Sequence, residues 1–355
     1  MKKYFPILIS KPGEVVALRH LAQNVKDEIC PVIEVIPDKI KPDPKPGARQ
    51  GPNIMESLRN FLINHWSFND NEVIIDFSWY ENLAQNIPVI RRFMNALFNA
   101  GVNIIPAIQA NSPNAYIGLV QTLVTNNQCS VCIRTSNRSG GFVNYNNSVN
   151  GLIARVNTTP ANSILLLDLG YAQLKDHAIL ASIADASINS LRPTKNHWEN
   201  IIVAAGSFPD ALTNLAPRIA PHRLRRYEWD IWNALHLAHP NVKYGDFGTK
   251  FPFYAEAPYA GSISVKYTSG NTNEFVIYRG ELTENNAHGH GQYIIHAQRL
   301  IATPDYSGAG FSWGDLEINR IAHENVNDPN RSTGTPAKWV QFSQNHHITL
   351  LHSLL

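Results

Sequence analysis

The sequence predicts an α/β fold, a (β/α)8 TIM-like barrel followed by a C-terminal α/β extension. Eight short apolar runs rich in β-branched residues recur before residue 250, as in parallel strands covered on both faces. Helical patterns separate these runs, and this alternation predicts βα units. After residue 250 the pattern changes to two alternating runs around a polar turn. A doubly wound open sheet is the alternative, and the count of eight favours a closed barrel.

The strands and helices are predicted from these runs and spacers in chain order. The predicted strands cover residues 4–10, 30–36, 72–77, 103–109, 130–134, 163–168, 200–205 and 242–246. The spacers place apolar residues three and four positions apart, as an amphipathic helix does. The predicted helices cover residues 14–25, 87–99, 113–125, 145–156, 177–191 and 227–237.

The spacer at residues 38–64 differs from the others. It begins with DKIKPDPKPGARQGP, whose four prolines and two glycines predict a loop rather than a helix. Because it follows the second strand directly, this loop is expected on the carboxyl face of the barrel. A long loop in that position is often functional.

Residues 251–355 are predicted to form the C-terminal extension, and residues 1–250 the barrel. Two alternating runs flank the polar turn SGNTN, which is the signature of a β-hairpin. Helical patterns follow at about residues 291–302, 314–324 and 335–344. Since no clear linker precedes this region, it is expected to pack on the barrel.

Composition narrows the classes of function. The formal net charge is only +2, so the protein as a whole is not an electrostatic partner for nucleic acid, although a local basic patch stays open. Three cysteines argue against a disulfide framework, and Cys129-x-x-Cys132 lacks the second pair of a zinc site. No apolar run approaches the ~20 residues that span a bilayer. A cytoplasmic protein with no membrane partner is therefore expected.

Seven of the eight predicted strands end in a charged or amide side chain. Barrel enzymes place their catalytic groups at this carboxyl end, so the side chains are expected to converge on one mouth. The candidate catalytic carboxylates are Glu34, Asp76, Asp168 and Asp246. The candidate ligand-binding residues at the other strand ends are Lys11, Gln109, Arg134 and Ser207.

The chemistry of these residue types suggests two roles. Neighbouring carboxylates can share a divalent cation or divide acid and base duties, while Lys11 and Arg134 can hold phosphate or carboxylate. The alternative is structural: Glu34, Asp76 and Asp168 form salt bridges with Lys11 and Arg134, or the strand-end residues cap the following helices or face water. The carboxylates make a divalent metal ion the cofactor to consider. Because no residue spacing matches a metal-site motif, the identity of that metal stays unknown.

Other motifs are weaker or missing. Basic and aromatic residues cluster at 218–229, in the run RIAPHRLRRYEW, as in a surface that touches nucleic acid. A solvated helix start, compensated by Glu228 and Asp230, is the favoured interpretation. The chain contains no GxGxxG, Walker, HExxH or GxSxG motif, which removes the usual support for nucleotide-binding and triad-hydrolase classes.

The two ends of the chain carry a family resemblance. The opening YFPILISKPGEVVALRHL with PVIEVIP, and the closing FSWGDLEINRIA with GTPAKWVQFSQNHHITLL, resemble the "beta" family of phage and prophage proteins over nearly the full length. The matching motif positions are Lys11, Glu34, Trp313, Gly314, Asp315, His346 and His347. The family pattern has Trp-Arg where this chain has Trp339-Val340, which weakens any role for a basic group there.

The resemblance implies a role in conflict between phage and host, without naming a reaction. Members are encoded in phages, satellite prophages and bacterial defence islands, and the namesake counteracts the toxicity of an adjacent killer protein. By this resemblance the chain is expected to be an antiphage, toxin–antitoxin-like protein. Its expected partner is a toxin or effector protein from the same locus.

The C-terminal motif has its own physical interpretation. Asp315 is expected to cap a helix start, with Trp313 packed before it, and Asp315, His346 and His347 are candidate ligand-binding residues. The run ITLL after the histidines predicts a final strand, with one imidazole inward and one outward. Either this segment locks the tail onto the barrel, or Asp315 and a histidine reach over the mouth and complete the pocket.

The leading functional prediction is an antitoxin-like or regulatory partner of an effector, with a polar ligand pocket at the barrel mouth. The alternative is a metal-dependent phosphodiesterase or nuclease that uses the carboxylates to hold metal and Lys11 and Arg134 to grip phosphate. A third prediction is direct DNA binding through residues 218–229. The ligand considered is a phosphate-containing molecule or nucleic acid, and whether the chain is an enzyme stays open.

Overall fold

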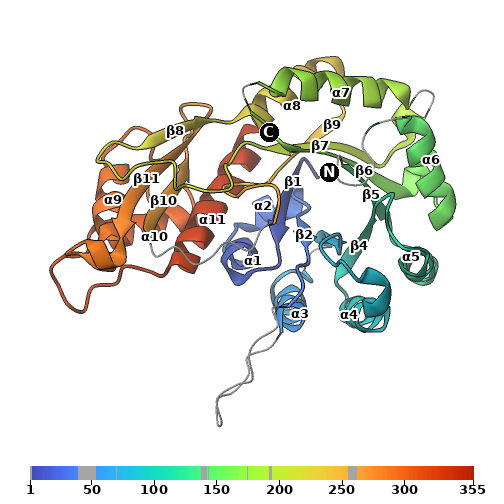
Figure 1. Cartoon of the computed structure of the whole chain (residues 1–355). Helices are drawn as coiled ribbons and strands as arrows, with labels where there is room; N and C mark the ends of the chain where they lie inside the picture. The colour runs from blue at the N-terminus through green and yellow to red at the C-terminus, as the bar shows by residue number, and fades with distance from the viewer. Residues whose placement is uncertain are drawn as a thin grey trace, which may run out of the picture.

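The chain folds around a closed, eight-stranded parallel barrel, which confirms the predicted TIM-like fold (Figure 1). The computed structural model describes residues 2–38, 53–68, 70–136, 142, 144–173, 175–191, 194–254 and 262–355. Strand β9 pairs in parallel with both β7 and β1, and this pairing closes the barrel. The barrel strands are β1 (Tyr4–Ile9), β2 (Val32–Glu34), β3 (Glu72–Asp76), β4 (Asn103–Ile108), β5 (Val131–Ser136), β6 (Ser163–Tyr171), β7 (Asn200–Gly206) and β9 (Val242–Asp246).

Helices cover the outside of the barrel between these strands (Figure 1). The helix predicted at residues 14–25 is two helices, because the chain is extended at Ala22. The helices around the barrel are α1 (Pro12–Arg19), α2 (Gln23–Glu28), α3 (Ile54–His65), α4 (Ile87–Asn99), α5 (Asn114–Asn127), α6 (Tyr145–Val156), α7 (His177–Ser190) and α8 (Tyr227–Ala238). Short 3-10 turns are η1 (Leu83–Asn86), η3 (Pro160–Asn162), η4 (Lys195–His197), η5 (Thr283–Asn285) and η6 (Gly289–Gly291).

The prediction of a loop through residues 38–64 is wrong for its second half, which is helix α3. The prolines and glycines end at Pro52, and the side chain of Asn53 then accepts a hydrogen bond from the backbone N–H of Glu56 at 2.7 Å. This cap starts an amphipathic helix that buries Met55, Leu58 and Leu62. Residues 39–52 of the predicted loop lie outside the described residues.

A second, smaller sheet lies beside the barrel and carries its own helices (Figure 1). The predicted hairpin is confirmed as antiparallel strands β10 (Ser262–Thr268) and β11 (Glu274–Leu282). Strand β8 (His222–Arg225) completes this sheet by pairing with β11, so the predicted helix start at 218–229 is wrong for these four residues. The helices of this part are α9 (Gln292–Ile301), α10 (Trp313–Ala322) and α11 (Pro336–Leu354).

Helix α11 joins the two parts of the molecule. It packs against α1 of the barrel on one side and against α10 and β10 on the other. The predicted final strand at ITLL is wrong, because α11 runs unbroken through His346 and His347 to Leu354. Residues at three- and four-residue spacing, from Trp339 to Leu351, are buried along it, so the helical period prevails over the β-branched run.

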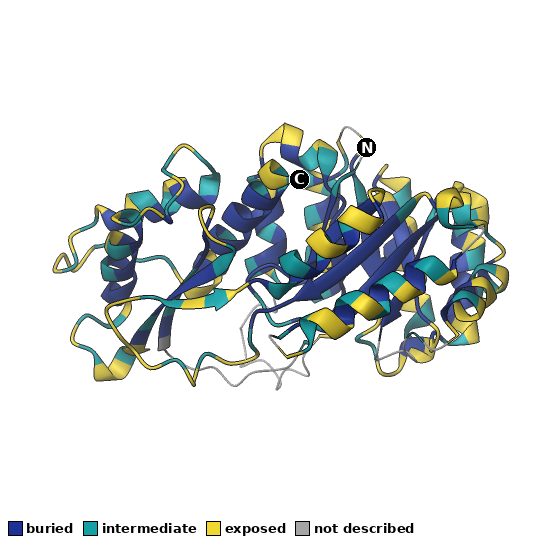
Figure 2. Cartoon of the chain, turned by 90° about the horizontal axis from the view of Figure 1, so that it is seen from above, coloured by how far each residue is buried: buried dark blue, intermediate teal, exposed yellow. Residues whose placement is uncertain are grey.

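Buried apolar side chains gather in separate clusters of this arrangement, and Figure 2 shows the strands buried between partly exposed helices. Apolar side chains fill the barrel interior, among them Val32, Ile74 and Leu166. A larger layer lies between the barrel strands and their helices, and a separate cluster fills the small C-terminal part. Within the described part of the chain, no helix is both long enough and apolar enough to span a bilayer.

Candidate functional site

Four of the predicted strand-end residues meet inside the carboxyl end of the barrel. Side chains alternate between the two faces of a strand, and Glu34, Asp76, Arg134 and Asp168 each follow an inward-facing residue by two positions. Glu34 of β2 also lies directly opposite Asp76 of β3 in the parallel register. These four residues are called the mouth cluster below.

Arg134 stands at the centre of the mouth cluster. Its guanidinium nitrogens lie 2.8 Å from Glu34 Oε1, 2.5 Å from Asp76 Oδ2 and 2.7 Å from Asp168 Oδ2. The same Asp168 oxygen accepts a second hydrogen bond, from Arg134 Nε, at 3.2 Å. Strand β5 therefore supplies one planar cation that its neighbours surround with three carboxylates.

The remaining carboxylate oxygens also have partners. Asp76 Oδ1 accepts from the backbone N–H of Ser78 at 2.8 Å, and Asp168 Oδ1 accepts from that of Gly170 at 2.9 Å. Lys250, just beyond β9, places its ammonium 3.5 Å from Glu34 Oε2. Among the described contacts, Arg134 within the mouth cluster and Lys250 beside it both offset the negative charge of the carboxylates.

Burial and charge act in opposite directions on Arg134. Burial acts to lower its pKa, but Asp168, Glu34 and Asp76 together hold the pKa well above its usual value. The residues of the mouth cluster are at most 2% exposed. Breaking such a buried group by removing its cation is strongly destabilising, because the carboxylates are left uncompensated.

The chain covers the mouth with the segment from Lys250 to Tyr254, called the strap below. A Cβ on Gly206 would lie 2.8 Å from Pro252, and a Cβ on Gly170 would lie 2.9 Å from Phe253, so β7 and β6 both end directly against the strap. Glycine at these two strand ends permits that close approach.

Aromatic contacts extend the strap across the mouth. The ring of Phe251 packs edge-on against Tyr171 with centroids 5.0 Å apart, and Tyr254 packs against Trp79 at 5.7 Å. Lys11 lies over the face of Tyr254, with its Nζ 4.9 Å from the ring centroid. Lys11 therefore contributes to the cover of the mouth cluster, and its backbone occupies the N-cap position of α1 without a capping hydrogen bond from the side chain.

A small cavity beside β3 and β4 reaches the edge of the mouth cluster. Its volume is about 200 Å³, and its lining includes Asp76, Gln109 and Tyr116. The backbone N–H of Gln109 donates to the Ser112 hydroxyl at 2.9 Å, which orders the loop after β4. Gln109 thus lies near the cluster, as predicted for a strand-end residue, and Asp76 is the cluster member that this cavity touches.

The donor set of the mouth cluster does not fit a divalent metal ion. Among the described residues, no group of three or more His, Cys, Asp or Glu side chains is arranged to hold one. The three carboxylates point at Arg134, so its guanidinium already occupies the point where they converge. A metal there would meet that fixed positive charge.

Asp246 does not join the mouth cluster, although it ends strand β9. The preceding Gly245 faces inward, where a Cβ would meet Ala204 and Ile202, so Asp246 points outward. There it accepts hydrogen bonds from the hydroxyl of Tyr4 at 2.7 Å and from that of Tyr244 at 2.9 Å. The sequence correctly predicts Asp246 at the carboxyl end of its strand. Its side chain, however, lies on the outer face of the barrel and not on the inner face.

A hydrogen-bonded chain, called the junction chain below, runs from Asp246 into the C-terminal part. His347 Nε2 lies 2.8 Å from Asp246 Oδ2, and His347 Nδ1 lies 2.8 Å from the Thr268 hydroxyl on β10. The backbone oxygen of Thr268 lies 2.8 Å from His346 Nε2, and His346 Nδ1 lies 2.8 Å from Asp315 Oδ2. These contacts link β9, α11, β10 and α10 through buried groups.

The two histidines of the junction chain meet different partners. Both ring nitrogens of His346 face acceptors, the carbonyl of Thr268 and the carboxylate of Asp315. His347 faces one carboxylate and one hydroxyl, which suits a neutral ring. Burial lowers the pKa of His347 and outweighs the opposing effect of Asp246.

Asp246 and Asp315 are each held by several donors. Burial acts to raise the pKa of Asp246, but His347, Arg226 and the Tyr4 hydroxyl lower it to about 2. Asp315 accepts from the hydroxyls of Tyr267 at 2.6 Å and Ser312 at 2.5 Å. Ser312, and not Asp315 as predicted, is the N-cap of α10.

The other C-terminal motif residues pack at the same junction. Trp313 stacks on His20 at the end of α1, with ring centroids 3.8 Å apart. A Cβ on Gly314 would collide with the backbone of Phe342, so only glycine allows α10 to approach α11 this closely. Asp315, His346 and His347 therefore lie between the barrel and the small sheet, and none of the three lies in the mouth cluster.

Ser207 and the basic run have local structural partners. The Ser207 hydroxyl accepts from the backbone N–H of Tyr227 at 2.9 Å and so holds the start of α8. Arg223 pairs with Asp305 at 2.5 Å and Arg225 with Asp230 at 2.7 Å. These pairs compensate the charges of Arg223 and Arg225 locally, whereas Arg218 donates to the backbone carbonyls of Ala220 and Pro221.

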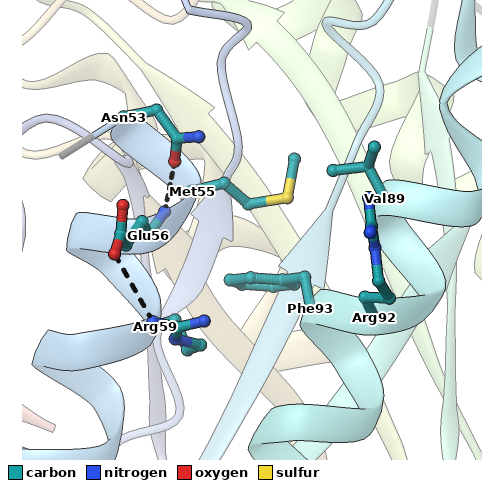
Figure 3. Close-up of a pocket in the computed structure, with 7 residues that line it drawn as sticks. All are labelled: Asn53, Met55, Glu56, Arg59, Val89, Arg92 and Phe93. Carbon is teal, nitrogen blue, oxygen red and sulfur yellow. Dashed lines mark hydrogen bonds and ion pairs between the residues drawn. The ribbon is translucent and has the colours of Figure 1, made fainter.

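A groove between α3 and α4 lies on the outer helix layer (Figure 3). Met55 and Phe93 extend into the space between the two helices, and Val89 lies exposed at its edge. Arg59 and Arg92 also line this groove of about 330 Å³. No strand-end argument finds such a surface, because it depends on how two helices pack.

Sequence reasoning also missed the strap and the partners of Asp246. The signal for the strap was the run KFPFY at 250–254, which follows β9 where a solvated loop would be polar. The roles of the Tyr4 and Tyr244 hydroxyls are not predicted from the sequence: Tyr4 meets Asp246 only through the fold, and Tyr244 donates to Asp246 two residues along its own strand.

Comparison with known proteins identifies a family. The family model described as Beta protein matches residues 4–352, which is nearly the whole chain. None of the curated proteins matches the sequence.

Proposed function

The chain belongs to the Beta protein family, a phage-associated family, and we propose that it acts by binding and restraining a partner effector protein. The partner is a toxin or effector encoded in the same locus, and the chain is antitoxin-like in this antiphage pairing. The observation that supports the proposal is that the strap covers the mouth cluster, whose carboxylates are paired with Arg134. A partner would therefore bind on the outer surface of the molecule.

The mouth gives little support to the alternative of metal-dependent phosphodiester cleavage. Such a reaction needs carboxylates that are available to hold metal, and it needs a path by which substrate reaches them. Here the carboxylates are already paired with Arg134, and the strap lies over them. A phosphate ligand at the mouth would also have to displace Asp168 or Glu34 from the guanidinium.

The groove between α3 and α4 is the surface that best fits a protein partner. It combines an apolar floor of Met55 and Phe93 with Arg59 and Arg92. Glu56 is the one carboxylate among its described lining residues, and it lies 3.7 Å from Arg59. An amphipathic helix of the effector with acidic residues beside its apolar face would match both features.

The test is co-expression of the chain with the effector encoded beside it, followed by affinity capture and size-exclusion chromatography. We expect a stable complex and restored growth of cells that express the effector. The double variant Arg59→Glu and Arg92→Glu should weaken the complex at least tenfold, because it reverses the charge of the groove. Circular dichroism and thermal melting establish that the variant is folded.

Arg91→Glu is the matched control, because Arg91 is exposed on α4, the helix that carries Arg92, and is not among the residues that line the groove. It should leave the complex and the growth rescue unchanged. An equal effect of this control, or the absence of a complex with the wild-type chain, contradicts the proposal. Divalent-metal-dependent phosphodiester cleavage that Asp76→Asn abolishes in a folded variant would favour the enzyme instead.

A further inference from the structure

A second polar site lies at the opposite, amino end of the barrel. A cavity of about 410 Å³ opens there between the starts of β7 and β9 and the 3-10 turn η4. Its volume is in the range of small-molecule sites, and neither the mouth cluster nor the junction chain contributes to its lining. The amino face of a barrel normally serves stability, so a polar cavity there needs a separate explanation.

A buried histidine holds one lysine at the edge of this cavity. The ammonium of Lys195 contacts His239 Nδ1 at 2.5 Å, and His239 Nε2 lies 2.8 Å from Asp185 Oδ1. An ammonium can only donate, so Nδ1 accepts and Nε2–H donates to the carboxylate. His239 is only 4% exposed, and it therefore fixes the position of Lys195.

Lysines outnumber carboxylates in the described lining of the cavity. Lys243, at the start of β9, also lines it, so two ammonium groups and one carboxylate, that of Glu199, contribute to its described lining. Glu199 accepts a hydrogen bond from the Ser130 hydroxyl at 2.5 Å. A phosphomonoester carries a charge of about −1.5 to −2 at neutral pH, which two lysines can balance. The single carboxylate in the lining is outnumbered by these lysines.

Trp198 supplies a second, independent observation. Its side chain lines the cavity and is 8% exposed. The indole Nε1 is buried and has no hydrogen-bond acceptor among the described residues, which is unusual for a buried tryptophan. Ile201 and Val242 add apolar surface beside it.

From these contacts we propose that the cavity binds a phosphomonoester with a planar apolar body, of about mononucleotide size. The phosphate interacts with Lys195 and Lys243, and the apolar body lies against Trp198 and its aliphatic neighbours. His239 is a positioning residue, because it acts on the ligand only through Lys195. This binding is independent of the effector partner.

The test is isothermal titration calorimetry of the full chain with AMP as the probe, beside adenosine and inorganic phosphate. We expect AMP to bind more tightly than either fragment, because each fragment keeps only half of the contacts. Lys195→Ala and Lys243→Ala should each weaken AMP binding at least tenfold. His239→Gln should weaken it several-fold, and the double variant with Lys195→Ala should weaken it no further than Lys195→Ala alone.

Lys338→Ala is the matched control, since Lys338 is exposed on α11, away from the barrel's amino end. It should bind AMP as the wild type does. Equal binding of adenosine and AMP overturns the role of the lysines, and equal binding of inorganic phosphate and AMP overturns that of the apolar wall. No heat with millimolar AMP, in a protein whose melting shows it folded, overturns the proposal.

Discussion

The mouth cluster and the junction chain are both buried and polar, but they are built on different kinds of charge. The mouth cluster centres on Arg134, whose charge is permanent, and gathers strands β2, β3, β5 and β6 of one barrel. The junction chain runs through His346 and His347 and joins the barrel to the small sheet, and burial lowers the pKa of His347.

This difference teaches what each region contributes. A guanidinium with three carboxylates gives the barrel end a single fixed arrangement at any ordinary pH. A chain of imidazoles and carboxylates connects separate elements, and its strength can change with protonation. The family motif residues Asp315, His346 and His347 all belong to the second kind, so the motif coincides with the joint between the two parts.

Removing the central cation should produce the largest effect. Arg134→Met leaves Glu34, Asp76 and Asp168 buried beside one another, with Lys250 still 3.5 Å from Glu34, and we expect a loss of about 3–5 kcal/mol of unfolding free energy. Urea unfolding followed by circular dichroism measures it. The combined variant that adds Asp76→Asn and Asp168→Asn should recover part of the loss, because it removes two of the uncompensated charges.

A loss below about 1 kcal/mol for Arg134→Met would show that the mouth cluster contributes no more than a surface salt bridge. The two substitutions Asp76→Asn and Asp168→Asn without the arginine change are the matched control. They leave Arg134 with Glu34, so they should destabilise the protein less than Arg134→Met does.

Breaking the junction chain at its far end should have an intermediate effect. Asp315→Asn removes the charge that pairs with His346 and turns an amide N–H toward a ring nitrogen or a hydroxyl that already donates, at a cost of about 2–3 kcal/mol. Hydrogen exchange should show faster exchange in α10 and α11 and unchanged exchange in β3 and β5. Uniform acceleration over both regions would contradict the assignment of the chain to the joint.

The sequence predicted the barrel well because its signal is local and repeated. Each parallel strand is a short apolar run, and the strand ends then follow from counting. The convergence of Glu34, Asp76, Arg134 and Asp168 was predicted in this way, including the alternative that they form salt bridges. The functional roles assigned to these residues stay predictions.

The features that sequence reasoning missed depend on contacts between distant segments. Asp246 is one residue out of the inward register, because Gly245 takes the inward position of β9. Strand β8 is a strand because it pairs with β11. His346 and His347 lie on a helix, although the run ITLL that follows them begins with two β-branched residues. Propensity is weak in such places, and tertiary packing decides the outcome.

The smallest effect should be a pH dependence of the stability that arises in the junction chain and not in the mouth cluster. The lowered pKa of His347 means that the unfolded chain binds the proton more readily than the folded protein does, so stability falls as pH drops below about 6.5. One proton limits this slope to about 1.4 kcal/mol per pH unit. Asp246, whose pKa is lowered to about 2, loses its contribution only below about pH 4, and Arg134 does not titrate in this range.

His347→Gln isolates this titration, because glutamine can still donate to Asp246 but cannot take up the proton. Between pH 7 and pH 5 the wild type should lose stability relative to this variant, as measured by urea unfolding at each pH. Glu228, whose pKa burial raises to about 7, acts in the opposite direction but is present in both proteins, so its effect cancels in the difference. A stability difference that stays constant or grows toward pH 5 would mean that His347 is already charged in the folded protein, and the contrast between a fixed mouth and a titratable joint would then fail.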